Sequence, residues 1–150
     1  MKKCIVLLFS LIVLAGCGSG AKKTVTCTFD EMEGGKATAI MSYDDEKTIT
    51  QLKLNTIMEV PSYVFEDKDL LKNFKESMQQ SADKKSKLSN VSTDLKIDEK
   101  KGTAELTITI DQKGINKDNA DEIGFHYTTN IKQAIKQYEA NKFECTKLES

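Results

Sequence analysis

The sequence TITQLKLNTIMEV, residues 48–60, is the longest run of the chain in which apolar and polar residues alternate. Because neighbouring side chains of a β-strand point to opposite faces of the sheet, the run predicts a strand inside a sheet, buried on one face. The buried face, beneath the helices, is expected to hold Leu52, Leu54, Met58 and Val60, and the polar face Gln51, Lys53, Asn55 and Glu59. Pro61 ends the strand because proline cannot donate a ladder hydrogen bond.

Four shorter runs have the same period of two and predict further strands. They cover residues 24–29, 36–43, 91–97 and 104–110. In the first of them Cys27 faces the core. Polar turns at residues 30–35, 44–47 and 99–102 separate the runs, so we expect antiparallel pairing.

Two segments have apolar residues at helical spacing. The first begins at about Asp67 and fades in residues 81–89. The second is capped by Thr128 or Thr129 and ends at Asn141, a residue suited to the left-handed end position. Their apolar stripes are Leu70, Leu71, Phe74 and Met78, and Ile131, Ala134, Ile135 and Tyr138. The predicted fold is α+β, an antiparallel sheet of five to six strands in the order β-β-β-α-β-β-α with two helices packed on one face.

The N-terminus combines the sequence MKK with an apolar run over residues 5–14 and small residues before Cys17. These regions are typical of a secretory signal, and the run is too short to span a bilayer. Residues 14–17, LAGC, resemble the lipobox of bacterial lipoprotein precursors. The resemblance implies that residues 1–16 are removed and that Cys17 carries a thioether-linked diacylglyceryl group. An ordinary cleaved signal with a chance cysteine at its end is the alternative.

Removal of residues 1–16 from the 150-residue chain leaves 134 residues, enough for one domain with a core. Residues 17–23 are then a lipidated cysteine with a flexible tether of about 13 Å reach, and residues 24–150 are the domain. The expected location is the outer face of the cell membrane, with the membrane as a partner through the lipid on Cys17.

The charge of the chain argues against a nucleic-acid partner. It contains no arginine, and 20 of its 22 lysines remain after cleavage to face 23 carboxylates, a net charge of about −3. Lysine also lacks the planar fork that binds phosphate or guanine in a bidentate way. The bias toward lysine, asparagine and isoleucine without arginine favours a Gram-positive source.

The four cysteines have different predicted fates. Cys4 leaves with the signal and Cys17 carries lipid. Cys27 and Cys145 lie near the two ends of an exported domain, so we predict a disulfide, which needs a short final strand at Cys145 beside the first strand. In the chain-entropy model it contributes about 5 kcal/mol. Two free, buried thiols are the alternative, and the spacing does not match a zinc site.

The mature chain resembles the YehR-type family of small bacterial lipoproteins. The resemblance lies in the lipobox, the strand pair 37–43 and 51–56, the first helix, the second hairpin and the closing helix that leads into residues 141–143. It covers nearly the whole mature chain. The family has no established biochemical activity, so the resemblance implies no catalytic residue.

Little in the sequence indicates catalysis. His126 is the single histidine, and no serine or cysteine nucleophile stands in a recognisable motif. Residues 111–122 do not match the spacing of a calcium loop. We therefore predict no catalytic residue, metal or cofactor.

The expected function is a binding or interaction module that contacts an envelope protein or a small ligand. A hydrolase-type envelope enzyme with an unrecognised site is the alternative. The candidate interaction face is the polar side of the longest strand, with Gln51, Lys53, Asn55 and Glu59. Aromatic residues that flank strand ends could instead line a ligand groove or complete the core; they are Tyr43, Tyr63, Phe65 and Tyr127.

Overall fold

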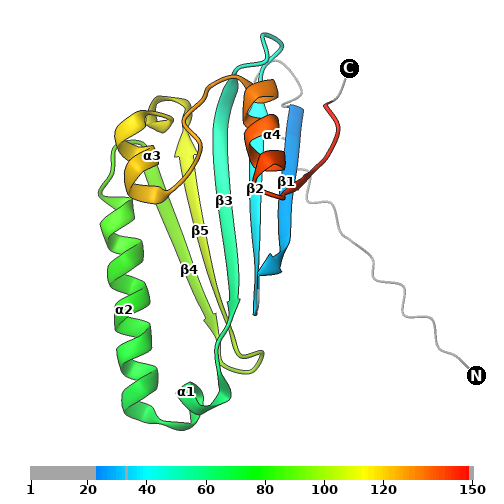
Figure 1. Cartoon of the computed structure of the whole chain (residues 1–150). Coiled ribbons are helices and arrows are strands. Elements are labelled where there is room, and N and C mark those ends of the chain that lie inside the picture. Colours follow the sequence, from blue (N-terminus) through cyan, green and yellow to red (C-terminus); the bar gives the residue numbers. More distant parts are fainter. Residues whose placement is uncertain (1–22, 33, 149–150) are drawn as a thin grey trace, which may run out of the picture.

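The computed structural model describes residues 23–32 and 34–148, so the predicted signal peptide and the lipidated Cys17 lie outside the described residues. The described chain forms a six-stranded antiparallel sheet with the strand order β4-β5-β3-β2-β1-β6 (Figure 1). The strands are β1 (Lys23–Met32), β2 (Gly35–Tyr43), β3 (Ile49–Glu59), β4 (Val91–Asp98), β5 (Thr103–Asp111) and β6 (Glu144–Cys145). The predicted α+β class and antiparallel sheet are confirmed.

Residues 23–32 and 34–148 form four α-helices and a 3-10 turn, whereas the sequence pattern predicted two helices. They are α1 (Ser62–Glu66), α2 (Lys68–Ser86), η1 (Gln112–Gly114), α3 (Lys117–Ile123) and α4 (Ile131–Ala140). The predicted fading of the first helix in residues 81–89 is wrong, because α2 continues to Ser86. Ala82 is buried there, and its carbonyl accepts a hydrogen bond from the Thr93 hydroxyl of β4. Tertiary packing thus extends a helix whose own apolar pattern has ended.

The helix ends show which capping predictions hold. The first helix begins about where it was predicted, and Asp67 caps α2, since its carboxylate accepts from two backbone N–H groups. The cap of α4 is Asn130, not Thr128 or Thr129. Asn141 has an ordinary φ of −100°, and Lys142 takes the left-handed conformation instead.

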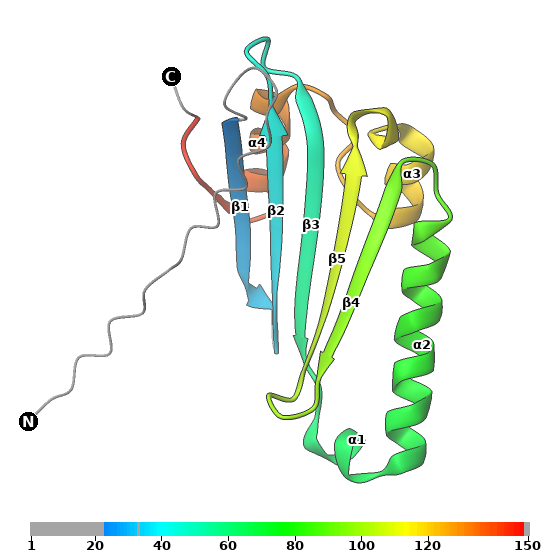
Figure 2. The same ribbon diagram turned by 180° about the vertical axis from the view of Figure 1, so that it is seen from behind.

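Helices α3 and α4 lie on one face of the sheet, near the β2–β3 turn, and α2 runs alongside β4 (Figure 1). The opposite face carries no helix in the described part of the chain (Figure 2). We call this the open face. The core fills the space between the sheet and the helices, with Tyr43, Met41, Ile110, Ile131 and Val25 as its most buried large side chains.

The predicted alternation of β3 is confirmed, but the depth of burial is not uniform. Leu52 and Val60 are buried, at 3% and 7% exposure, and Lys53 is exposed on the open face. Leu54 and Met58 are only half-buried, contrary to the prediction that all four apolar residues lie beneath the helices. Helices α3 and α4 lie over the end of the sheet near the β2–β3 turn (Figure 1), whereas Met58 lies toward the opposite end, where it pairs with Gly35 of β2.

The disulfide between Cys27 and Cys145 is present, with the two Cα atoms 4.0 Å apart and Cys27 fully buried. It joins β1 to the short β6, where the two cysteines are directly paired. Two boundary predictions for β1 are wrong: the strand already includes Lys23, which was assigned to the tether, and it continues past Asp30 to Met32. Lys23 pairs with Tyr43 of β2, which accounts for the earlier start, and after Phe29 the register shifts before Met32 pairs with Gly35, so the strand continues through an irregularity at the predicted break.

Candidate functional site

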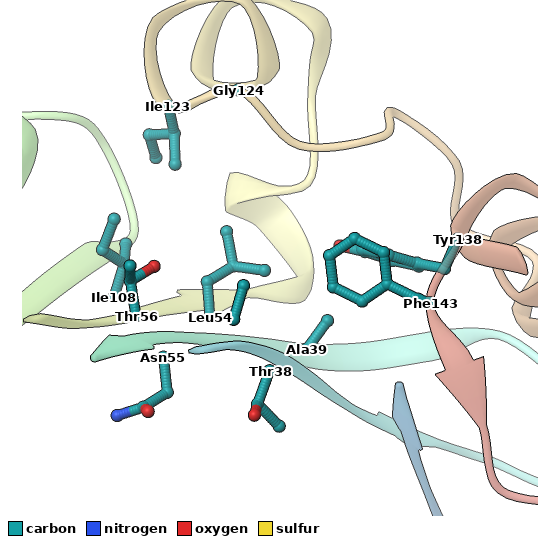
Figure 3. A pocket seen from close by; sticks show the side chains of 11 residues that line it. Thr38, Ala39, Leu54, Asn55, Thr56, Ile108, Ile123, Gly124, Tyr138 and Phe143 are labelled. Atoms are coloured by element: carbon teal, nitrogen blue, oxygen red, sulfur yellow. The ribbon is translucent and has the colours of Figure 1, made fainter. Parts of the chain in front are cut away.

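A cavity of about 170 Å³ lies between the sheet and the C-terminal segments (Figure 3). Three strands form its floor, the end of α3 its roof, and α4 with the following segment one wall. The side chains that point into it are Ala39, Leu54, Thr56, Ile108, Ile123, Tyr138 and Phe143, and Ala37 also contributes to the lining. Leu54 is thus half-buried because it borders this cavity.

Local structure fixes the roof and the wall. Gly124 ends α3 with a φ of +88°, a conformation that favours glycine, and its N–H donates to the carbonyl of Ala120. After α4 the chain turns back through Lys142, and the Phe143 N–H donates to the Tyr138 carbonyl. The chain therefore folds back on α4 at Phe143, and this turn places both rings at the cavity.

Four aromatic side chains, which we call the aromatic wall, are stacked from β1 to the α3–α4 loop. They are Phe29, Phe143, Tyr138 and His126. The ring centroids of neighbouring members are 5.4, 5.1 and 5.2 Å apart, within the range of favourable aromatic pairs. The wall holds the Tyr138 ring between Phe143 and His126 at the side of the cavity.

The Tyr138 hydroxyl is the unusual polar group of this site. Tyr138 is 6% exposed, its oxygen exposes less than 1 Å², and it has no hydrogen-bond partner in the described protein. The side chain extends toward the cavity (Figure 3). Burial raises the pKa of the hydroxyl to about 12, because the charged phenolate would lose its hydration.

Replacing Tyr138 by phenylalanine is expected to raise the free energy of unfolding by about 1 kcal/mol at pH 7, because it removes a buried, unsatisfied hydroxyl. In the wild-type protein the pKa of this group is higher in the folded state than in the unfolded state, so the neutral form is favoured by folding. The associated stability is complete below about pH 10 and falls as the pH rises toward 12, by about 2 to 3 kcal/mol.

Urea denaturation of wild type and Tyr138→Phe at pH 7, 10 and 11.5 measures both effects. Above pH 10 the free energy of unfolding of wild type should fall further below that of the variant. A variant that is less stable at pH 7, with a constant difference across the series, would mean that the hydroxyl is satisfied inside the protein.

His126 is not arranged as a catalytic base in the part of the chain that the structure describes. The Asn141 side-chain nitrogen lies 3.1 Å from its Nε2 and also donates to the Gln137 carbonyl. Because an amide N–H can only donate, Nε2 accepts this hydrogen bond. The ring also packs edge-on against Tyr138. These contacts fit a structural role in the aromatic wall.

The predicted interaction residues do lie on the open face, where they share one side of β3. Two of them are engaged with β5: the Asn55 amide donates to Glu105 and Thr107, at 2.6 and 2.9 Å, and the Gln51 amide lies 3.4 Å from Asp111. Lys53 and Glu59 are exposed. The role of this face in partner binding stays a prediction.

The structure does not bring the four predicted aromatic groove residues together. Tyr43 is buried in the core, Tyr63 and Tyr127 are 61% and 56% exposed, and Phe65 lies near the β4–β5 turn. Three residues of the aromatic wall, Phe29, Tyr138 and Phe143, were not predicted from the sequence to lie at a site. Two features of the sequence could have indicated that these rings are neighbours. They are the predicted disulfide, which joins β1 to β6, and the turn that follows α4.

Comparison with known proteins supports the fold. No family profile and no curated protein matches the chain. The structure is similar to an NMR structure of a protein from Streptococcus pneumoniae TIGR4, with a TM-score of 0.62 and 16% identity over 97% of this chain and 98% of that one. At this identity the likeness establishes the α+β fold alone.

Two further findings concern metal binding and membrane spanning. Within residues 23–32 and 34–148, no group of three or more histidine, cysteine, aspartate or glutamate side chains is placed to hold a metal ion. None of the helices described here is long and apolar enough to cross a membrane.

Proposed function

We propose that the protein is a lipid-anchored binding module on the outer face of the cell membrane, and that the cavity beside the aromatic wall holds its ligand. The observation that carries the proposal is the cavity itself, an indentation into which aliphatic and aromatic side chains and Thr56 point, with a buried hydroxyl at its side. Small-molecule sites are typically concave and apolar with a few placed polar groups. The LAGC sequence supports the anchoring half of the proposal.

The end of the sheet that faces the membrane in this proposal is the end where β1 begins. Lys23 is paired there with Asp45 of the β2–β3 turn, with Nζ and Oδ1 3.4 Å apart. Because the tether from Cys17 is short, this end stays close to the lipid surface. Helix α1 and the β4–β5 turn lie at the far end of the sheet (Figure 1).

Cys17→Ala is expected to abolish lipid attachment and processing by the lipoprotein signal peptidase, because the thioether needs the cysteine sulfur. Metabolic labelling with a palmitate analogue, followed by fractionation, measures the loss. Cys4→Ala is the matched control and should keep its label. Label that persists on Cys17→Ala would remove the lipoprotein assignment.

The binding role is tested by purifying the lipidated protein from its own membranes in mild detergent and analysing co-purifying small molecules by mass spectrometry. Ala37→Leu places a larger side chain at the cavity, and Thr38→Leu is the control because Thr38 points to the open face (Figure 3). A compound retained by wild type and Thr38→Leu, but lost from Ala37→Leu, supports the proposal. Equal recovery from all three proteins contradicts it.

The alternative of a hydrolase-type enzyme has less support. Hydrolysis of this type needs a nucleophile within hydrogen-bond reach of a base. The residues around the cavity are alanines, threonines, a leucine, isoleucines, an asparagine, a glycine and two aromatic residues, and His126 contacts Asn141 and Tyr138. This arrangement favours binding over hydrolysis.

A further inference from the structure

We propose that the cavity selects a small, uncharged molecule with an apolar body and one hydrogen-bond acceptor, and that the acceptor pairs with the Tyr138 hydroxyl. This inference rests on the proposed function, since it specifies the ligand of the same cavity. Size, charge and the unpaired hydroxyl each restrict the ligand class.

The size of the cavity limits the buried part of the ligand. Its volume is about 170 Å³, and an apolar cavity of about 150 Å³ in another protein holds one benzene molecule. The buried body therefore has about six to ten non-hydrogen atoms. Leu54, Ile108 and Ile123 supply aliphatic contacts above and below it (Figure 3), which suits a ring or a short branched chain.

The residues that line the cavity restrict the charge of the ligand. The eleven residues around the cavity include no lysine, aspartate, glutamate or histidine. Placing an ionised group in such surroundings without a partner of opposite charge is costly. The buried part of the ligand is therefore neutral.

The hydroxyl of Tyr138 determines which polar group the ligand needs. A phenolic hydroxyl both donates and accepts, and this one is buried without a protein partner. Burial raises its pKa, so the hydroxyl stays protonated at physiological pH and keeps its donor hydrogen. A carbonyl or ether oxygen of a ligand would satisfy it without the loss of an existing hydrogen bond, but since the oxygen exposes less than 1 Å², the side chains packed around it have to shift for the acceptor to reach it.

A matched pair of probes tests this selection. Acetophenone and isopropylbenzene have the same number of non-hydrogen atoms and similar shapes, but only acetophenone carries an acceptor. Titrations of the domain, residues 24–150, are followed by methyl NMR. Both probes are expected to shift the methyl signals of Leu54, Ile108 and Ile123, while Ile40, which pairs with Lys53 on the open face, stays unchanged. Acetophenone should bind more tightly, and benzoate should not bind.

Tyr138→Phe separates the hydrogen bond from mere filling of the cavity. The variant is expected to weaken acetophenone binding about fivefold, the loss of one hydrogen bond, and to leave isopropylbenzene binding within about twofold. Its methyl spectrum reports whether the fold is kept. Equal effects on the two probes, or preferential binding of benzoate, would overturn the inferred selection.

Failure of this inference is distinguishable from failure of the binding role. If the molecule recovered from membranes is lost from Ala37→Leu but is ionised, or unaffected by Tyr138→Phe, the binding role holds and the inferred ligand class is wrong. If every recovered molecule is retained by Ala37→Leu and neither probe shifts the methyl signals of the cavity, the binding role and the inferred ligand class are both wrong.

Discussion

Loss of the Cys27–Cys145 disulfide is expected to lower the free energy of unfolding by about 2 to 5 kcal/mol, one of the largest single effects available in this chain. The two residues are separated by 118 positions, so the bond restricts nearly the whole unfolded domain. The bond also holds β6 against β1. Only two residues of each strand are paired there, so few hydrogen bonds support this contact.

Cys145→Ser is the appropriate variant, because Cys145 lies in the short edge strand whereas Cys27 is buried in the core. Urea denaturation of wild type with and without reductant, and of the variant under both conditions, gives the effect. Reductant should lower the midpoint of wild type to about that of Cys145→Ser and leave the variant unchanged. A wild-type midpoint that does not respond to reductant would show that the bond does not stabilise the domain.

The second large effect concerns the register of β3. Leu52→Ala is expected to cost about 2 to 5 kcal/mol, because Leu52 is 3% exposed and its removal leaves a void in the core. Lys53→Ala, one residue further on, should cost less than about 0.5 kcal/mol. Leu54→Ala should fall between them, since Leu54 already borders a cavity.

Chemical denaturation of the three variants tests this order. If Lys53→Ala were the most destabilising, the strand would be displaced by one residue and every side chain of β3 would be on the opposite face. If Leu54→Ala cost as much as Leu52→Ala, the cavity would be closed in solution.

Most of the sheet was predictable because the period of two is a local property of the sequence. The alternation around Leu52 and Lys53 assigned the faces of β3, and the expectation that the chain is exported led to the predicted pairing of Cys27 and Cys145. Helix boundaries were less predictable. The last turns of α2 depend on the packing of Ala82 against β4, and the cap of α4 depends on a bridge between Asn130 and Thr48 across the fold.

The candidate site was not predictable, because it exists only through tertiary structure. Ile123 ends one helix, Tyr138 lies on another, and Phe143 follows a turn, so no spacing in the sequence marks them as neighbours. The absence of a partner for the Tyr138 hydroxyl is likewise a property of packing. The polar residues of the longest strand, in contrast, were visible in the sequence, yet a polar sheet face is what any one-sided sheet exposes to water.

The most direct measurement is an experimental structure of the protein purified from its own membranes, with no step that strips bound molecules. We predict a bound molecule between Leu54 and Ile123, with an acceptor atom within hydrogen-bonding distance of the Tyr138 hydroxyl. A structure in which Phe143 or Ile123 fills the space and the Tyr138 hydroxyl is bonded to the protein itself would contradict the proposed binding role.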